Sequence, residues 1–234
     1  MTTRHVLAFD LETTGVSSFS DAPVSFGTIE RVERSGTETE IIDSGLINPG
    51  RHIPAGASKI HGITDEMVAE ALVLADAVEI LAERISSSWQ EGAIVVGMNV
   101  GYDLTMVDSL CRRLGLRSFE DRCGVSPVMD ILVIDRHFDR WRRGARKLGD
   151  LCRQYGVATG DAHSALDDAR AALAVFDVLC AKYGDLNAIS LADVNVTLRE
   201  WYREWLRSFS AYRVRRGEPE IEPGRYEWPI HVDG

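Results

Sequence analysis

Short apolar runs separated by polar breaks dominate the first half of the chain. Five of them predict strands, at His5 to Phe9, Val24 to Val32, Ile41 to Ile47, Ala93 to Gly97 and Val128 to Ile131. The polar stretch 33–40 predicts a hairpin loop between the second strand and the third. Three consecutive strands followed by strand–helix alternation indicate a mixed sheet with helices on its faces.

Longer stretches with apolar residues at helical spacing predict helices. They lie at about Asp76 to Gln90, Val100 to Leu114, Lys147 to Tyr155, Ala165 to Tyr183 and Val194 to Tyr212. Thr64 is a plausible N-cap for one more helix. We therefore expect an α/β domain over residues 1–184 and, over residues 185–234, a C-terminal helical extension with an extended tail.

Composition limits the possible functions. The formal net charge is −10, from 26 Lys and Arg against 36 Asp and Glu, which argues against a protein that coats nucleic acid by bulk charge. It does not argue against an enzyme that meets a chain end at one site.

No stretch approaches the roughly 20 apolar residues of a membrane span, and we expect a cytoplasmic protein. No C-x-x-C pair suggests zinc, so we expect buried, reduced thiols at Cys111, Cys123, Cys152 and Cys180.

Two carboxylates end the first predicted strand. Because residues two apart on a strand face the same side, Asp10 and Glu12 project together. Carboxylate oxygens suit hard cations such as Mg²⁺ or Mn²⁺. Two solvated acids at an exposed strand end are the plainer interpretation of this pair taken alone.

A second acidic segment follows the fourth predicted strand. Asn99 is expected to cap the helix that opens there, and Asp103 lies about one turn further on, on the same side. Asp103 could simply complement the helix dipole, and Tyr102 could be a core residue.

The third segment places a histidine before an acidic helix start. Ser164 and Asp167 fit a capping box, which fixes the register of the helix. His163 and Asp168 then occupy the two neighbouring positions where apolar side chains normally pack against each other. That departure favours a chemical role for both residues.

Phosphodiester hydrolysis would explain the whole set. Two metal ions roughly 4 Å apart can hold the attacking and leaving oxygens, and several carboxylates are needed to bind two dications. A histidine can take the proton from the attacking water because imidazole titrates near neutrality.

These three segments resemble the motifs of the DEDDh exonucleases. Asp10-x-Glu12 followed by Thr-Thr-Gly is similar to the first motif, Asn99-x-x-Tyr102-Asp103 to the second, and His163-x-Ala-x-x-Asp168 to the third. The resemblance covers about Val6 to Tyr183 and is greatest to the epsilon-type proofreading branch. It implies a ribonuclease H-like fold and a 3′→5′ exonuclease that uses two Mg²⁺ or Mn²⁺ ions.

The resemblance also implies the role of each residue. His163 would be the general base, and the metal-binding carboxylates would be Asp10, Glu12, Asp103 and Asp168. The substrate-binding residues would be Leu11, Thr13, Thr14, His61, Asn99 and Tyr102. DNA is the favoured substrate. An RNA exonuclease similar to oligoribonuclease or to the tRNA-trimming relatives stays open, and so does a non-catalytic scaffold.

Two further segments each have two interpretations. Residues 136–147 carry six basic residues against one acid, and are either a solvated loop or a contact to backbone phosphates in which Trp141 stacks on a base. Aromatic residues at helical spacing in Val194 to Tyr212 indicate a helix packed on the domain, or alternatively a docking helix for a protein partner.

Overall fold

The structure is a computed structural model that describes residues 4–125, 127–160 and 163–231. One mixed sheet has the strand order β4-β3-β2-β1-β5-β6. The strands are β1 (Arg4–Thr13), β2 (Pro23–Arg34), β3 (Thr37–Asn48), β4 (Leu72–Val73), β5 (Ile94–Gly97) and β6 (Val128–Asp130). The mixed sheet flanked by helices is confirmed. Five strands were expected, but the two residues of β4 are too few for a hydrophobic pattern to mark.

Ten helices and one 3₁₀ turn occur in the described ranges. They are α1 (Ala55–His61), α2 (Asp65–Val68), α3 (Leu74–Gln90), α4 (Gly101–Leu114), α5 (Phe119–Arg122), α6 (Ile131–Phe138), α7 (Leu148–Tyr155), α8 (Ala165–Lys182), α9 (Gly184–Ala188), α10 (Val194–Arg215) and η1 (Pro223–Tyr226). None of these helices is long and apolar enough to span a bilayer.

The hairpin between β2 and β3 is tighter than the polar pattern predicts. The strands run on to Arg34 and from Thr37, so the turn is only Ser35 and Gly36, both with positive φ (53° and 80°). Such angles give a turn whose twist matches the two strands. The strand ends are solvent-exposed, so no alternation of apolar and polar residues marks them.

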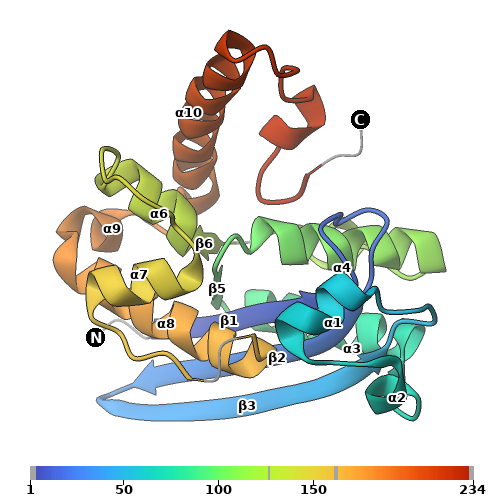
Figure 1. The fold of residues 1–234 in the computed structure, drawn as a ribbon. Helices are drawn as coiled ribbons and strands as arrows, with labels where there is room; N and C mark the ends of the chain where they lie inside the picture. The colour runs from blue at the N-terminus through green and yellow to red at the C-terminus, as the bar shows by residue number, and fades with distance from the viewer. Residues whose placement is uncertain (1–3, 126, 161–162, 232–234) are drawn as a thin grey trace.

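Helices cover both faces of the sheet (Figure 1). Glu30 of β2 accepts a hydrogen bond from Ser88 of α3, whereas its neighbour Arg31 pairs with Asp177 of α8. Since successive side chains of a strand point to opposite faces, α3 and α8 lie on opposite sides of β2. Strands β1, β5 and β6 are parallel, so their carboxyl ends meet at one edge.

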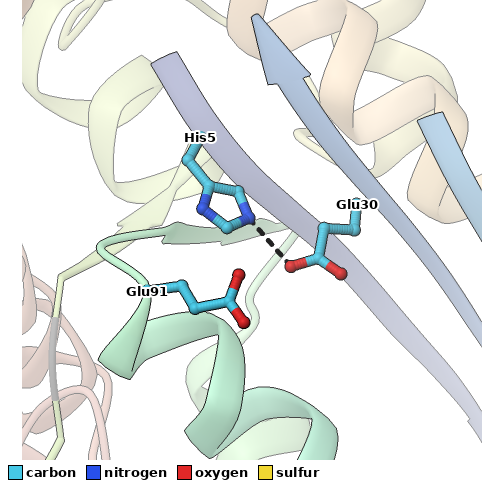
Figure 2. A group of neighbouring side chains, drawn as sticks. All are labelled: His5, Glu30 and Glu91. Carbon is cyan, nitrogen blue, oxygen red and sulfur yellow. Dashed lines mark hydrogen bonds and ion pairs between the residues drawn. The ribbon is translucent and has the colours of Figure 1, made fainter. Parts of the chain in front are cut away.

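A polar cluster fastens the other end of β1 (Figure 2). Nε2 of His5 lies 2.8 Å from a Glu30 oxygen, and Glu91 at the end of α3 is beside them. Glu30 also accepts from Ser88 and lies 3.4 Å from Arg84, so its charge is balanced. The sequence pattern predicts no role for His5, and the structure makes it a link between β1 and β2.

The C-terminal segment packs back onto the domain. Leu198 and Leu206 of α10 are buried, and so is Trp228 beyond the helix. Arg199 donates to the carbonyl oxygen of Trp228, and the backbone N–H of His231 donates to Thr105 of α4. The expected extended tail contains the turn η1, and its residues 232–234 lie outside the described residues.

The cysteines are free, as expected, but they are not all buried. Cys111, Cys152 and Cys180 are buried, whereas Cys123 is exposed. Cys123 follows the one-turn helix α5 at the molecular surface, where no periodic pattern could reveal its exposure.

Candidate active site

Asp10 and Glu12 lie at the carboxyl end of β1, facing α8. Asp10 is paired with Gly27 of β2, and directly paired residues project from the same face. A Cβ atom on Gly27 would lie 2.5 Å from the carbonyl carbon of Ala165 and overlap the backbone of Leu166. Glycine at this position therefore lets the start of α8 approach the carboxylates of β1.

The second motif enters the site from α4, without the cap that we expected. Asn99 adopts a left-handed conformation (φ 57°), and the N-cap position is Val100, with no side-chain hydrogen bond. Asparagine tolerates this conformation, which turns the chain sharply between β5 and α4. Asp103 follows in the first turn and is only 4% exposed.

The third motif forms the start of α8. Ser164 is at the N-cap, as expected, but its side chain makes no capping hydrogen bond, so the predicted capping box is wrong. The backbone of the preceding His163 is also left-handed (φ 71°). One donor atom each from Glu12, His163 and Asp168 lies within 4.8 Å of the others. The structure thus brings the first and third motifs together.

Mutual repulsion among the carboxylates shapes the electrostatics of this site. Burial raises the pKa of Asp10 well above its usual range, and the charges of Asp103, Asp168 and Glu12 raise it further. Burial and the charge of Asp168 raise the pKa of Glu12 to about 7. Burial also raises the pKa of Asp103 and of Asp168. The site therefore favours protons or cations.

Basic side chains do not balance these charges. Within the described ranges, neither Lys nor Arg forms an ion pair with any of the four carboxylates. Asp135 offers a contrast: its fully buried side chain pairs with Arg142 and Arg146 and accepts a hydrogen bond from Tyr155. A carboxylate buried for structural reasons is neutralised inside the protein. The unpaired acidic cluster instead fits bound cations.

A hydroxyl network joins the first motif to the second. Tyr102 donates to the carbonyl oxygen of Gly15 at 2.7 Å, and Thr13 donates to the same oxygen at 2.7 Å. Burial raises the pKa of Tyr102 to about 12, which keeps its hydroxyl a donor. Thr14 is turned into the loop, where its hydroxyl binds Asp21 and the backbone of Ala22. Any contact of Thr14 with substrate therefore goes through its backbone.

His61 reaches the site from the end of α1. Its Nδ1 accepts a hydrogen bond from the backbone of Ile63, while its Nε2 is buried without a partner among the described residues. Burial lowers the pKa of His61, the backbone of Thr13 opposes this effect, and the nearby His163 lowers the pKa further. Both histidines line a cavity of about 330 Å³ that also touches Phe26 and Ser164.

Asp130 is a residue at the site that the sequence motifs do not include. It ends β6 and is 2% exposed, and its carboxylate accepts hydrogen bonds from the backbone N–H groups of Asn99 and Leu132. Burial raises its pKa to about 6. Like Asp10, Asp130 follows an apolar strand directly, and this position is the feature of the sequence that could have identified it as a site residue. The predicted strand extends to Ile131, but Ile131 is the first residue of α6.

The basic segment 136–147 contains both structural arginines and a solvent-exposed aromatic residue. Arg142 and Arg146 pair with the buried Asp135, and Arg146 also donates to backbone carbonyl oxygens. These two arginines are structural. Trp141, by contrast, is 85% exposed.

Solved structures of nucleases share the fold. Escherichia coli exonuclease I in complex with an oligonucleotide superposes with a TM-score of 0.63 at 18% identity, over 79% of this chain and 43% of that one. Exonuclease I from Methylocaldum szegediense gives 0.64 at 21% identity, over 87% and 45%. The likeness establishes a ribonuclease H-like fold.

Sequence relatives point the same way. The epsilon subunit of DNA polymerase III from Treponema pallidum is 29% identical over 77% of this chain and 78% of its own length. A PolC-type DNA polymerase III from Caldanaerobacter subterraneus is 26% identical over 83% of this chain, which spans only 13% of that protein. The profile of the exonuclease family RNase_T matches residues 7–176. The chain belongs to this exonuclease family.

Proposed function

We propose that this exonuclease removes nucleotides from the 3′ end of DNA, at single-stranded or frayed ends, and releases nucleoside 5′-monophosphates. One observation carries the proposal: four carboxylates, none of which pairs with a Lys or Arg of the described residues, and one histidine converge from β1, α4 and the start of α8. The scaffold alternative would predict loss of one of these groups, and all five are in place.

The relatives of this chain act in DNA metabolism or are solved with an oligonucleotide, which favours DNA over RNA as its substrate. The Treponema protein is a subunit of a DNA polymerase, and the structure of E. coli exonuclease I holds an oligonucleotide. Proofreading or repair would suit such an activity. We further propose that residues 1–184 form the exonuclease domain, with residues 185–234 as its extension, in a cytoplasmic protein.

The residues present fit a pair of divalent cations. Exonucleases of this family depend on divalent metal ions, and oxygen-only donors suit Mg²⁺ or Mn²⁺. Asp10, Glu12, Asp103 and Asp168 would hold them. Bound there, the ions would neutralise charge on the phosphate and on the leaving oxygen.

The side chains of the chain would position substrate and move the proton. His163, beside Glu12 and Asp168, would accept the proton of the attacking water on its imidazole. Leu11 and Thr13 belong to the first motif and Tyr102 to the second, and their side chains would orient the terminal nucleotide. His61 lines the same cavity as His163, where it would contact a substrate group, and Asn99 stands exposed at the turn into α4.

A matched degradation assay tests the proposal. DNA and RNA oligomers of one sequence, labelled at the 5′ end, are incubated with Mg²⁺, Mn²⁺ or EDTA. We expect a ladder that shortens from the 3′ end, only with metal and faster on DNA, and no ladder from Asp10→Ala. Faster RNA degradation would favour the exoribonuclease alternative. Absence of hydrolysis on both substrates would refute the proposal.

A further inference from the structure

The outer part of α10 carries a column of aromatic rings. Trp205 stacks on Phe209 with ring centroids 5.1 Å apart, and Phe209 stacks on Tyr212 at 6.5 Å. The guanidinium of Arg136 from α6 lies 3.4 Å from the centroid of the Trp205 ring. With the neighbouring pair from the α6–α7 loop, these residues form the aromatic–arginine patch: Arg136, Arg140, Trp141, Trp205, Phe209 and Tyr212. Helix α10 projects from the domain (Figure 1).

The patch is open to solvent. Trp141 is 85% exposed, Tyr212 46% and Phe209 38%. Arg140 joins the loop to the helix, since it lies 5.3 Å from the Trp141 ring and pairs with Glu204. Large exposed aromatic groups gathered in one place indicate an interaction surface.

The charge around the patch indicates a polyanion as its partner. Helix α10 contains five arginines and two glutamates, in a chain whose net charge is −10. Arg215, three residues beyond Tyr212 and therefore beside it on the helix, is exposed, and across the described ranges it forms no ion pair. Arginine beside exposed aromatic rings is the combination that holds single-stranded nucleic acid, through phosphate contacts and base stacking.

The patch starts next to the candidate active site. Arg136 lies on α6, which begins directly after Asp130, and Asp130 accepts a hydrogen bond from the backbone of Asn99 in the second motif. From there the rings run along α10. Seven residues of helix separate Trp205 from Tyr212, about 10 Å.

We propose that the aromatic–arginine patch holds the single strand that leads to the scissile 3′ end. Its bases stack on Trp141 and lie against the exposed parts of the Phe209 and Tyr212 rings, while Arg215 contacts its phosphates. This inference rests on the proposed function and adds the path of the substrate upstream of the site.

A binding experiment in EDTA tests the patch without hydrolysis. Fluorescence anisotropy with a labelled oligothymidylate about 15 nucleotides long should show at least about tenfold weaker binding for the double variant Phe209→Ala and Tyr212→Ala. Val196→Ala is the matched control, because Val196 is an exposed apolar residue (60%) on the same helix. Circular dichroism checks that α10 remains folded. If the double variant loses helix, Phe209→Leu with Tyr212→Leu replaces it, since leucine keeps helix propensity and removes the ring.

Hydrolysis in Mg²⁺ separates failure of this inference from failure of the proposed function. The variant should lose kcat/KM on the long oligomer and keep it on a dinucleotide, which is too short to reach the patch. Unchanged anisotropy in the variants overturns the inference, and leaves α10 as a surface for another protein. If wild type binds the oligomer through the patch but hydrolyses nothing, the proposed function fails while the binding surface stands.

Discussion

The hydroxyl of Tyr102 donates a hydrogen bond to the carbonyl oxygen of Gly15, 87 residues earlier in the chain, at 2.7 Å. This bond fastens the turn after β1 to the first helical turn of α4. Thr13 ends β1 directly before this turn, and the helix carries Asp103, so the bond sets the distance between the first motif and the second.

Tyr102→Phe should therefore weaken both stability and catalysis. Loss of the hydroxyl leaves the Gly15 carbonyl with only its bond from Thr13, and we expect the free energy of unfolding to fall by about 1 kcal/mol. Because the turn is then less fixed, kcat/KM on oligonucleotides should fall as well. Urea denaturation and steady-state kinetics measure the two effects. Reduced stability with unchanged kcat/KM would limit Tyr102 to a structural role.

Gly27→Ala should disturb the site by pushing α8 away from strand β2. The added methyl group would overlap the backbone at Ala165 and Leu166, so α8 must move outward and carry His163 and Asp168 with it. We expect a loss of stability of about 1–3 kcal/mol together with a loss of activity. Gly56→Ala in α1 is the control, because a Cβ there meets open space. Equal behaviour of the two variants would contradict the close packing of α8 on β2.

Asp10→Asn should remove activity and raise the stability of the metal-free protein. Asp10 is repelled by three neighbouring carboxylates, and a neutral amide of similar shape relieves that repulsion. Mg²⁺ should raise the melting temperature of wild type much more than that of the variant, because a metal ligand is lost. A variant that melts lower than wild type in EDTA would show that Asp10 is structural.

Glu12 gives the metal-free protein a pH-dependent stability of definite sign. Its pKa is about 7 in the folded chain against an ordinary value of 4.5, so between these values the folded state binds more protons than the unfolded state. Stability therefore falls as pH rises from about 4.5 to 7. Melting curves in EDTA should show this slope in wild type and a shallower one in Glu12→Gln. Identical slopes would show that Glu12 has the same pKa folded and unfolded.

The sequence predicts the interior of this protein better than its surface. Strands β1 and β5 are buried apolar runs, and the motif residues follow them directly, so the resemblance to the DEDDh motifs groups Asp10 with Asp103. Asp130 was missed because its strand has only three residues, and the boundary between β6 and α6 depends on one capping hydrogen bond to Leu132. The left-handed backbone of Asn99 also leaves no mark in the pattern of apolar and polar residues.

His163→Gly separates the chemistry of the third motif from its backbone conformation. Histidine at φ 71° is strained, whereas glycine adopts this angle freely, and the gain offsets the greater entropy of unfolded glycine. Stability should therefore stay within about 1 kcal/mol of wild type. Turnover should still fall by about 10²–10⁴-fold if His163 moves the proton.

Two measurements on the same variant distinguish a base from a metal ligand, since His163 lies within ligand distance of Glu12 and Asp168. As a base, its removal should leave Mn²⁺ affinity, measured by calorimetry, nearly unchanged, and added imidazole should restore part of the turnover by accepting the proton. As a ligand, its removal should lower Mn²⁺ affinity, and turnover should recover at high metal concentration instead. Wild-type turnover in His163→Gly would assign the histidine neither role and leave Asp168 as the only chemical residue of the third motif.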